Sequence, residues 1–171
     1  MKKLFTLLLC SLILVFAGCG KTETNNPPPA PDTEKKADTA HLTAEDKEFK
    51  MSVSKEIRSL TAMNISTKDG YDVVSVLVSI ENVSKDNVPI SPDFVTLKTS
   101  DGAEYQYSQE LTRKITSKSA FKEVVLPPDY RGGGLLLFEL KKDSVPEALT
   151  YKDESDHQMT VQFPSKTKTS V

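Results

Sequence analysis

Residues 71–80, YDVVSVLVSI, alternate between apolar and polar side chains over most of their length. The apolar set is Val74, Val76, Val78 and Ile80. A period of two is typical of a β-strand with one buried face, and β-branched side chains fit a pleated sheet. The segment therefore predicts a central strand, which needs partner strands elsewhere in the chain.

Further short runs rich in β-branched and aromatic residues are separated by Asp-Gly, Asn and Pro turn signals. Residues 94–107, FVTLKTSDGAEYQY, predict two strands joined at Asp101-Gly102, because Asp-Gly favours tight hairpin turns. Residues 132–140, GGGLLLFEL, predict a buried strand that opens after glycines. Residues 148–163 predict a last hairpin, with the polar tip at 153–156.

The segment 48–60 is ambiguous. Phe49, Val53, Ile57 and Leu60 have helical spacing, whereas Phe49, Met51 and Val53 alternate as in a strand. We favour the strand. Short strands at this spacing, with turn residues between them, predict an all-β antiparallel sandwich.

The N-terminus has the organisation of an export signal. Met1-Lys2-Lys3 is basic, and the apolar run 4–16 would reach about 20 Å as a helix, short of the roughly 30 Å of a bilayer core. Ala17 and Gly18 then lead directly into Cys19. These features favour a cleaved signal peptide over a membrane span.

The end of this signal resembles the bacterial lipobox, although Phe16 occupies the position where Leu is commonest. The resemblance implies cleavage between Gly18 and Cys19 and a diacylglyceryl thioether on Cys19. A plain signal peptide with a chance cysteine is the alternative. The chain has two cysteines, and Cys10 would leave with the signal, so the exported domain would have no disulfide.

A polar, proline-rich stretch follows the cysteine. Residues 20–46 include Pro27–Pro29 and Pro31 and almost no apolar side chains, which predicts a disordered linker. A ligand for an aromatic groove is a less favoured interpretation. His41 falls in this stretch and is expected to have no site role.

These inferences divide the chain into four parts. They are a lipoprotein signal peptide at 1–18, a lipidated Cys19 with its linker at 19–46, a β-sandwich at 47–165, and a flexible tail at 166–171.

Within the predicted sandwich, a family resemblance appears. It rests on the runs VVSVLVSIENVS, FVTLKTSDGAEY, GGGLLLFEL and PEALTY, and within them on Asn82, Phe94, Leu97, Tyr105, Gly134 and Phe138. Over roughly residues 49–163 the chain resembles the DUF4352 family. These domains are extracytoplasmic and immunoglobulin-like, similar to the secreted mycobacterial antigen MPT63 and frequent on lipoproteins of Gram-positive bacteria. The resemblance implies a fold and a location but no activity.

One position departs from the family pattern. The family usually has Pro-Gly before the strand-opening glycine, and here Asp129 follows Pro128. Because glycine accepts positive φ without steric cost, we expect Gly132 and Gly133 to form the bend instead.

The predicted domain offers little catalytic or metal chemistry. Its only histidine, His157, cannot by itself build a zinc site or a Ser-His-Asp triad, and we expect it to be a polar residue at a strand edge. The acidic run 152–157 lacks the glycine and spacing of an EF-hand loop. A net charge of −2 gives no support for nucleic-acid binding. We therefore expect no metal, no cofactor and no enzymatic activity.

One pair of residues, Tyr130 and Arg131, is a better candidate for a contact surface. Tyr130 and Arg131 belong to residue types enriched in binding hot spots, and they precede glycines that no helix follows, so a phosphate loop is not expected. These two residues are the candidate contact patch. Tyr105 and Tyr107 are expected to pack on the sheet rather than to form a ligand platform.

The sequence thus favours a membrane-anchored, extracytoplasmic binding module whose partner, a protein, peptide or wall component, is unknown. One alternative is an inhibitor of exported proteases that acts through the long connection 108–119. Another is a wall-active enzyme that uses carboxylates such as Asp129 and Glu139. A structural role in the envelope also remains open.

Overall fold

The structure is a computed structural model, and it describes residues 40–60, 65 and 68–164. The expected signal peptide, the cleavage site at Gly18, the lipid attachment at Cys19, the proline-rich stretch and the expected tail at 166–171 lie outside these residues. No helix in the described part of the chain is long and apolar enough to cross a membrane.

The described chain is built mainly of strands. The strands are β1 (His41–Glu45), β2 (Phe49–Ser54), β3 (Arg58–Ser59), β4 (Tyr71–Asn82), β5 (Val88–Ile90), β6 (Val95–Thr99), β7 (Glu104–Gln106), β8 (Val124–Leu126), β9 (Arg131–Lys141), β10 (Pro146–Lys152) and β11 (Gln158–Gln162). A short 3-10 helix, η2 (Pro92–Phe94), precedes β6, and one α-helix, α1 (Gln109–Thr116), follows β7.

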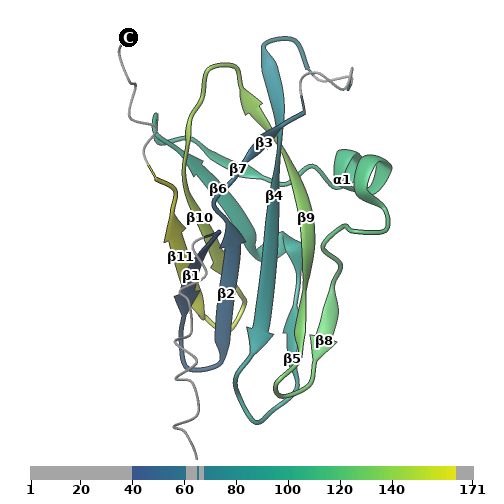
Figure 1. The fold of residues 1–171 in the computed structure, drawn as a ribbon, viewed down its shortest axis with the longest axis vertical. Coiled ribbons are helices and arrows are strands. Elements are labelled where there is room, and N and C mark those ends of the chain that lie inside the picture. Colours follow the sequence, from purple (N-terminus) through teal and green to yellow (C-terminus); the bar gives the residue numbers. More distant parts are fainter. Residues whose placement is uncertain (1–39, 61–64, 66–67, 165–171) are drawn as a thin grey trace, which may run out of the picture. The chain divides into compact units, whose positions relative to one another are not determined.

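Two antiparallel sheets face each other across the core (Figure 1). In the first sheet, β9 pairs with β4 along one edge, while β2 and β3 share the other edge and β1 pairs with β2. The second sheet has the order β11-β10-β6-β7, and β5 and β8 form a separate ribbon. This arrangement confirms the predicted antiparallel, immunoglobulin-like sandwich.

The core lies between the sheets, where the predicted alternation places it. Val76, Val78 and Ile80 of β4 are fully buried, whereas Val74 at the same face is only partly buried. Phe138 of β9 belongs to the same cluster. Burial of such side chains contributes about 1.5–3 kcal/mol each, so the inward face of β4 and β9 is a main source of stability.

The ambiguous segment 48–60 begins as a strand. Phe49, Met51 and Val53 of β2 are at most 1% exposed, and β2 pairs with β4 in a continuous register from Phe49 with Asn82 to Val53 with Val78. Pairing with a long central strand favours the extended alternative, since it satisfies the backbone while burying every second side chain. The strand prediction is confirmed.

Both predicted hairpins are present. β6 and β7 turn at Gly102, whose φ is +83°, and β10 and β11 pair from Ala148 with Gln162 to Lys152 with Gln158. The turn between β10 and β11 contains the expected acidic tip at 153–156.

The expected boundary between linker and domain is wrong. Residues 41–45 form β1, which pairs with β2 from His41 opposite Ser54 to Glu45 opposite Lys50. Leu42 and Ala44 pack against the core. Residues 41–46 were assigned to the linker because their apolar content is low, but an edge strand needs only one apolar face. Residues 41–45 therefore belong to the sandwich and not to a linker.

The connection 108–119 contains a helix, which the sequence prediction missed. Ser108 caps α1 by accepting a hydrogen bond from the backbone N–H of Leu111 at 3.4 Å. Leu111 is buried against Val73 and Leu137 on the outer face of the first sheet. An N-cap serine and one apolar face are sufficient to fold this segment on the sheet.

Helix α1 also covers the free edge of β9. The Leu137 N–H donates to Oγ1 of Thr112 at 3.0 Å, and the Leu137 carbonyl accepts from the Ser108 N–H at 2.7 Å. An uncovered strand edge can pair with another chain, so these bonds protect β9.

The turn before β9 also differs from the expectation. Asp129 itself adopts a left-handed conformation, with φ +64°. Of the two glycines expected to form the bend, Gly133 has a positive φ of +137°, within β9, and Gly132 does not. Aspartate tolerates this region better than most residues, so the turn forms without the family glycine. At Gly132 a Cβ would lie 2.8 Å from Cδ1 of Ile90 and 3.0 Å from Cδ2 of Leu126, so this glycine permits close packing of the β5–β8 ribbon.

Candidate functional site

Four turns meet at one end of the sandwich, which we call the loop end. They are residues 46–48, 83–87, 127–130 and 153–157, and they lie at the bottom of Figure 1. Loops on a rigid scaffold are where sandwiches commonly place their binding residues.

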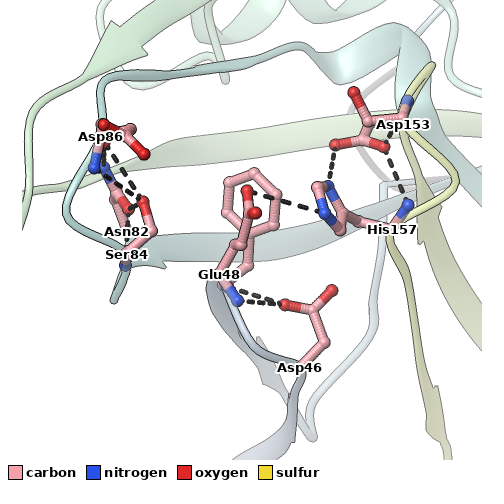
Figure 2. A network of polar contacts seen from close by, with 9 residues as sticks. Asp46, Glu48, Asn82, Ser84, Asp86, Asp153 and His157 are labelled. Carbon is pink, nitrogen blue, oxygen red and sulfur yellow. Dashed lines mark hydrogen bonds and ion pairs between the residues drawn. The ribbon is translucent and has the colours of Figure 1, made fainter.

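Asn82, the last residue of β4, organises two of these turns. It is fully buried, and its side-chain N–H groups donate to the carbonyls of Asp86 at 2.7 Å and Leu126 at 2.9 Å. Its side-chain oxygen accepts from both the N–H and the hydroxyl of Ser84 (Figure 2). The sequence marked Asn82 only as the end of a strand. Its partners could not be predicted, because Leu126 is 44 residues away.

The backbone of Asn82 fixes the turn 127–130 as well. Its N–H donates to the carbonyl of Tyr130 and its carbonyl accepts from the N–H of Asp129, both at 2.9 Å. Tyr130 in turn closes the loop by donating its N–H to the carbonyl of Pro127 at 3.2 Å. The positions of these turns are therefore determined by a single buried residue.

The turn 46–48 is held by a carboxylate. Oδ1 of Asp46 accepts hydrogen bonds from the N–H groups of Glu48 and Phe49, each at 2.8 Å. The carbonyl of Glu48 accepts from the N–H of Val83 at 2.8 Å. This turn is consequently tied to the end of β4.

His157 joins the two sheets at this end. Nδ1 lies 2.9 Å from Oδ2 of Asp153 in its own turn, and Nε2 lies 3.6 Å from Oε2 of Glu48 in the turn between β1 and β2 of the first sheet (Figure 2). Its ring packs edge-on against Phe49, with centroids 5.4 Å apart. His157 lies directly before β11, close to the expected strand edge, but its contacts across the sheets were not predicted.

The surroundings raise the pKa of His157 above its ordinary value. The hydrogen bond with Asp153 is the largest cause, and the negative charges of Asp153, Glu48 and Asp46 act in the same direction against the effect of burial. Opposite charges nearby favour the protonated ring.

Two buried polar atoms have no hydrogen-bond partner among the described residues. They are the hydroxyl of Tyr151 and Oδ2 of Asp46. Tyr151 is fully buried between the rings of Phe49 and Phe94, each with its centroid 5.8 Å away. Burial is the main cause that raises the pKa of Tyr151, so its phenol stays neutral.

A small recess of about 110 Å³ lies beside His157. It is lined by Glu48, Phe49, Val88, Pro89, Phe94, Asp153, Glu154, Ser155 and His157. Its apolar walls come from β2, the β5 ribbon and η2, and its polar walls come from the two turns. This volume accommodates only a few water-sized groups.

The two residues of the predicted contact patch differ in availability. Tyr130 is 64% exposed, while the guanidinium of Arg131 donates two hydrogen bonds, at 2.9 and 2.6 Å, to Oε2 of Glu81. Val83 and Val125 are also exposed. Val83 directly follows Asn82, and Val125 directly precedes Leu126, whose carbonyl accepts a hydrogen bond from Asn82. We call Val83, Val125 and Tyr130 the loop-end patch.

The other candidate residues occupy structural positions. Tyr105 and Tyr107 are partly buried against the core, and the hydroxyl of Tyr105 accepts from the Lys141 N–H at 3.3 Å, which agrees with the expected packing role. Burial is the largest cause that raises the pKa of Tyr107, and hydrogen bonding to Asp93 acts in the same direction.

The proposed carboxylate pair does not form. Asp129 precedes β9, whereas Glu139 lies near its other end, opposite Val73. At about 3.3 Å per residue the two are separated by roughly 30 Å, too far to act on one glycosidic bond. Among residues 40–60, 65 and 68–164, no three His, Cys, Asp or Glu side chains are placed to hold a metal ion.

Three other pockets among the described residues are larger than the recess beside His157. One, of about 600 Å³, lies where Lys55, Lys141 and Phe163 come together at the opposite end. Another, of about 440 Å³, lies between α1 and the outer face of the first sheet, with Leu77 and Leu135 in its lining. The third, of about 280 Å³, is lined by residues of η2 and α1 together with Tyr107.

Solved structures from bacteria are similar to this chain, and those with TM-scores above 0.5 share its fold. A candidate lipoprotein (ycdA) from Bacillus subtilis has 17% identity and a TM-score of 0.53, and the match covers 75% of this chain but 39% of that one. The yjhA protein from the same organism has 12% identity and a TM-score of 0.51, over 71% of this chain and 96% of that one. The secreted protein MPT63 from Mycobacterium tuberculosis has 11% identity and a TM-score of 0.46, over 72% and 92%.

Sequence comparison gives the family. No curated protein matches the chain. The domain of unknown function DUF4352, however, matches residues 41–160, and this range begins at the first residue of β1. The match extends over most of the chain and over the whole length of both sheets up to β11. The chain therefore belongs to the DUF4352 family.

Proposed function

We propose that the protein is a lipid-anchored, extracytoplasmic binding module that contacts a protein partner through its loop end. Support for the anchor comes from the lipobox-like residues before Cys19 and from the family. Support for a binding role comes from the loop-end patch.

The exposure of Tyr130 is the observation on which the contact surface rests. A side chain that is 64% exposed, on a turn held by the buried Asn82, presents a large amphipathic ring at little cost in conformational entropy. Val83 and Val125 add exposed apolar area on the turns and strand end that the Asn82 network joins. Arg131 has its charge directed to Glu81, so we assign it to support of the patch rather than to direct contact.

The direction of β1 suits this role. The chain enters the domain at Ala40, whose carbonyl accepts from the Lys55 N–H, and β1 then runs to the turn 46–48 at the loop end. Five residues of strand span roughly 17 Å. A linker attached before β1 would therefore join the domain away from the loop end.

The anchor is tested by replacing Cys19. We expect Cys19→Ser to remove the protein from the membrane fraction or to leave it as an unprocessed precursor, because the serine hydroxyl cannot form the thioether. Cys10→Ser is the matched control and should fractionate as the wild type. Acyl groups found by mass spectrometry on the wild type but absent from Cys19→Ser would support the anchor, and an unmodified wild-type thiol would refute it.

The contact surface is tested by cross-linking the full chain in intact cells and identifying captured proteins. Tyr130→Ser should abolish capture without lowering the thermal midpoint, since the side chain is exposed. Tyr71→Ser is the control, because Tyr71 is a tyrosine at the opposite end of β4 and is 38% exposed. Equal capture by the wild type and Tyr130→Ser would exclude the loop-end patch as the contact.

The geometry gives less support to the two alternatives. Helix α1 occupies the connection that a protease inhibitor would present as an extended segment, with Leu111 and Thr112 buried. The wide separation of Asp129 and Glu139 removes the carboxylate pair of the wall-active enzyme.

A further inference from the structure

Each ring nitrogen of His157 faces a carboxylate from a different sheet. Asp153 belongs to the turn between β10 and β11, and Glu48 belongs to the turn between β1 and β2. A carboxylate only accepts hydrogen bonds, and a neutral imidazole carries one N–H. The neutral ring can therefore donate to only one of the two carboxylates, whereas the protonated ring donates to Asp153 and forms an ion pair with Glu48.

Nearly all charges that face His157 are negative. Glu48 and Asp46 face it from the first sheet, and Asp153 and Glu154 come from its own turn. Lys152, the last residue of β10, carries a positive charge next to this turn and pairs with Asp156 at 3.2 Å. The β5 ribbon and η2 contribute Val88, Pro89 and Phe94 to the recess, and these residues carry no charge.

We propose that protonated His157 is a clasp between the two sheets at the loop end, and that loss of its proton releases the turn 153–157 and opens the recess over Phe49. The inference goes beyond the proposed function and does not depend on it, because it concerns the domain without a partner.

The turn 153–157 is the part that moves. Its own hydrogen bonds are internal: Oδ1 of Asp153 accepts from the N–H groups of Ser155 at 2.9 Å and His157 at 3.0 Å. The opposite turn is fixed by Asp46 and by the Val83–Glu48 backbone bond. A neutral His157 that keeps its proton on Nδ1 for Asp153 points a lone pair at Glu48, so the contact across the sheets becomes repulsive.

Release of the turn uncovers an aromatic surface. The ring of Phe49 is 1% exposed and is covered in part by His157, with which it makes an edge-on contact. The recess beside it already has an apolar wall that includes Phe94. The proton thus determines whether solvent or a small apolar group reaches Phe49.

Proton NMR of the full chain in detergent micelles measures the first step. The chain has two histidines, so the spectrum of His157→Gln identifies the ring signals that belong to His157. We expect His157 to titrate above 6.5. Glu48→Gln should lower the pKa of His157, because the charge of Glu48 is one of the causes that raise it. A pKa of His157 at or below 6.5 would overturn the proposal.

Hydrogen exchange, corrected for the intrinsic pH dependence of exchange, measures the opening. Amides of residues 153–158 should lose protection as pH rises through the pKa of His157, by about tenfold for each unit by which this pKa differs between the closed and the open turn. In His157→Gln the same amides should show no such step, and His41→Gln should behave as the wild type. If His157→Gln does not fold, Glu48→Gln provides the comparison. Unchanged protection across the titration in the wild type would show that His157 does not control the turn.

Discussion

The carboxamide of Asn82 donates a 2.9 Å hydrogen bond to the carbonyl of Leu126, and so joins the end of β4 to the end of β8. The same side chain also binds Asp86 and Ser84, and the residue is fully buried. The geometry of the loop end therefore depends on satisfied polar groups in a dry environment, where an unmade hydrogen bond is costly.

Replacing this residue should be strongly destabilising. We expect Asn82→Ala to lower the free energy of unfolding by about 2–4 kcal/mol, because it leaves the buried carbonyl of Leu126 and its neighbours without donors. Urea unfolding measures the change. Asn87→Ala, an exposed position in the same loop, should change stability by less than about 0.5 kcal/mol. Equal effects of the two substitutions would show that the Asn82 network contributes nothing specific.

The left-handed conformation of Asp129 predicts an order of stability among variants. With φ at +64°, Asp129→Gly should be at least as stable as the wild type, whereas Asp129→Ala should lose about 1 kcal/mol. Thermal unfolding of the three proteins tests the order. At an ordinary φ the order of glycine and alanine would be reversed, because glycine loses more entropy on folding.

Comparison of Gly134 with Gly70 separates the cost of steric overlap from the cost of backbone strain. The φ of Gly134 is +153°, and a Cβ would lie 2.5 Å from the backbone nitrogen of Phe121 and from the carbonyl oxygen of Ser119. Gly134→Ala should therefore cost about 3 kcal/mol or more. Gly70 also has a positive φ but has open space around it, so Gly70→Ala should cost only about 1 kcal/mol. Similar losses at both positions would mean that the Ser119–Phe121 segment moves away from β9.

The pH dependence of stability should reveal His157. The pKa of His157 is raised above 6.5 in the folded state, so the folded protein binds this proton more tightly than the unfolded chain does. The stabilisation is complete below pH 6.5 and disappears as pH rises through the raised pKa. Thermal midpoints of the wild type should fall over this range relative to those of His157→Gln. Parallel curves for the two proteins would contradict the assignment.

Much of the fold could be predicted, because its long strands have strong local patterns. The period of two in β4 and the Asp-Gly turn after β6 act within a few residues, and both sheets formed as these patterns indicate. Strand β1 was missed because Leu42 and Ala44 are its only apolar residues, and their burial depends on pairing with β2.

Helix α1 and the loop-end contacts were missed for different reasons. The helix had a readable signal, since Ser108 is a good N-cap and Leu111 and Ile115 are four residues apart, but we interpreted its polar residues as a loop. The contacts of Asn82 and His157 had no such signal in the sequence. Each joins segments far apart in the chain, and their meeting depends on how the strands are paired.

The ladder between β1 and β2 has a mechanical consequence. His41 to Glu45 pair with Ser54 to Lys50, and His41 is the end of β1 that lies away from the loop end. If the domain is held at the loop end while the chain before β1 is pulled along the axis of the strand, all five residue pairs bear the load together in shear. The strand would then have to slide as a whole instead of peeling away one bond at a time, so the first element of the domain is suited to withstand tension.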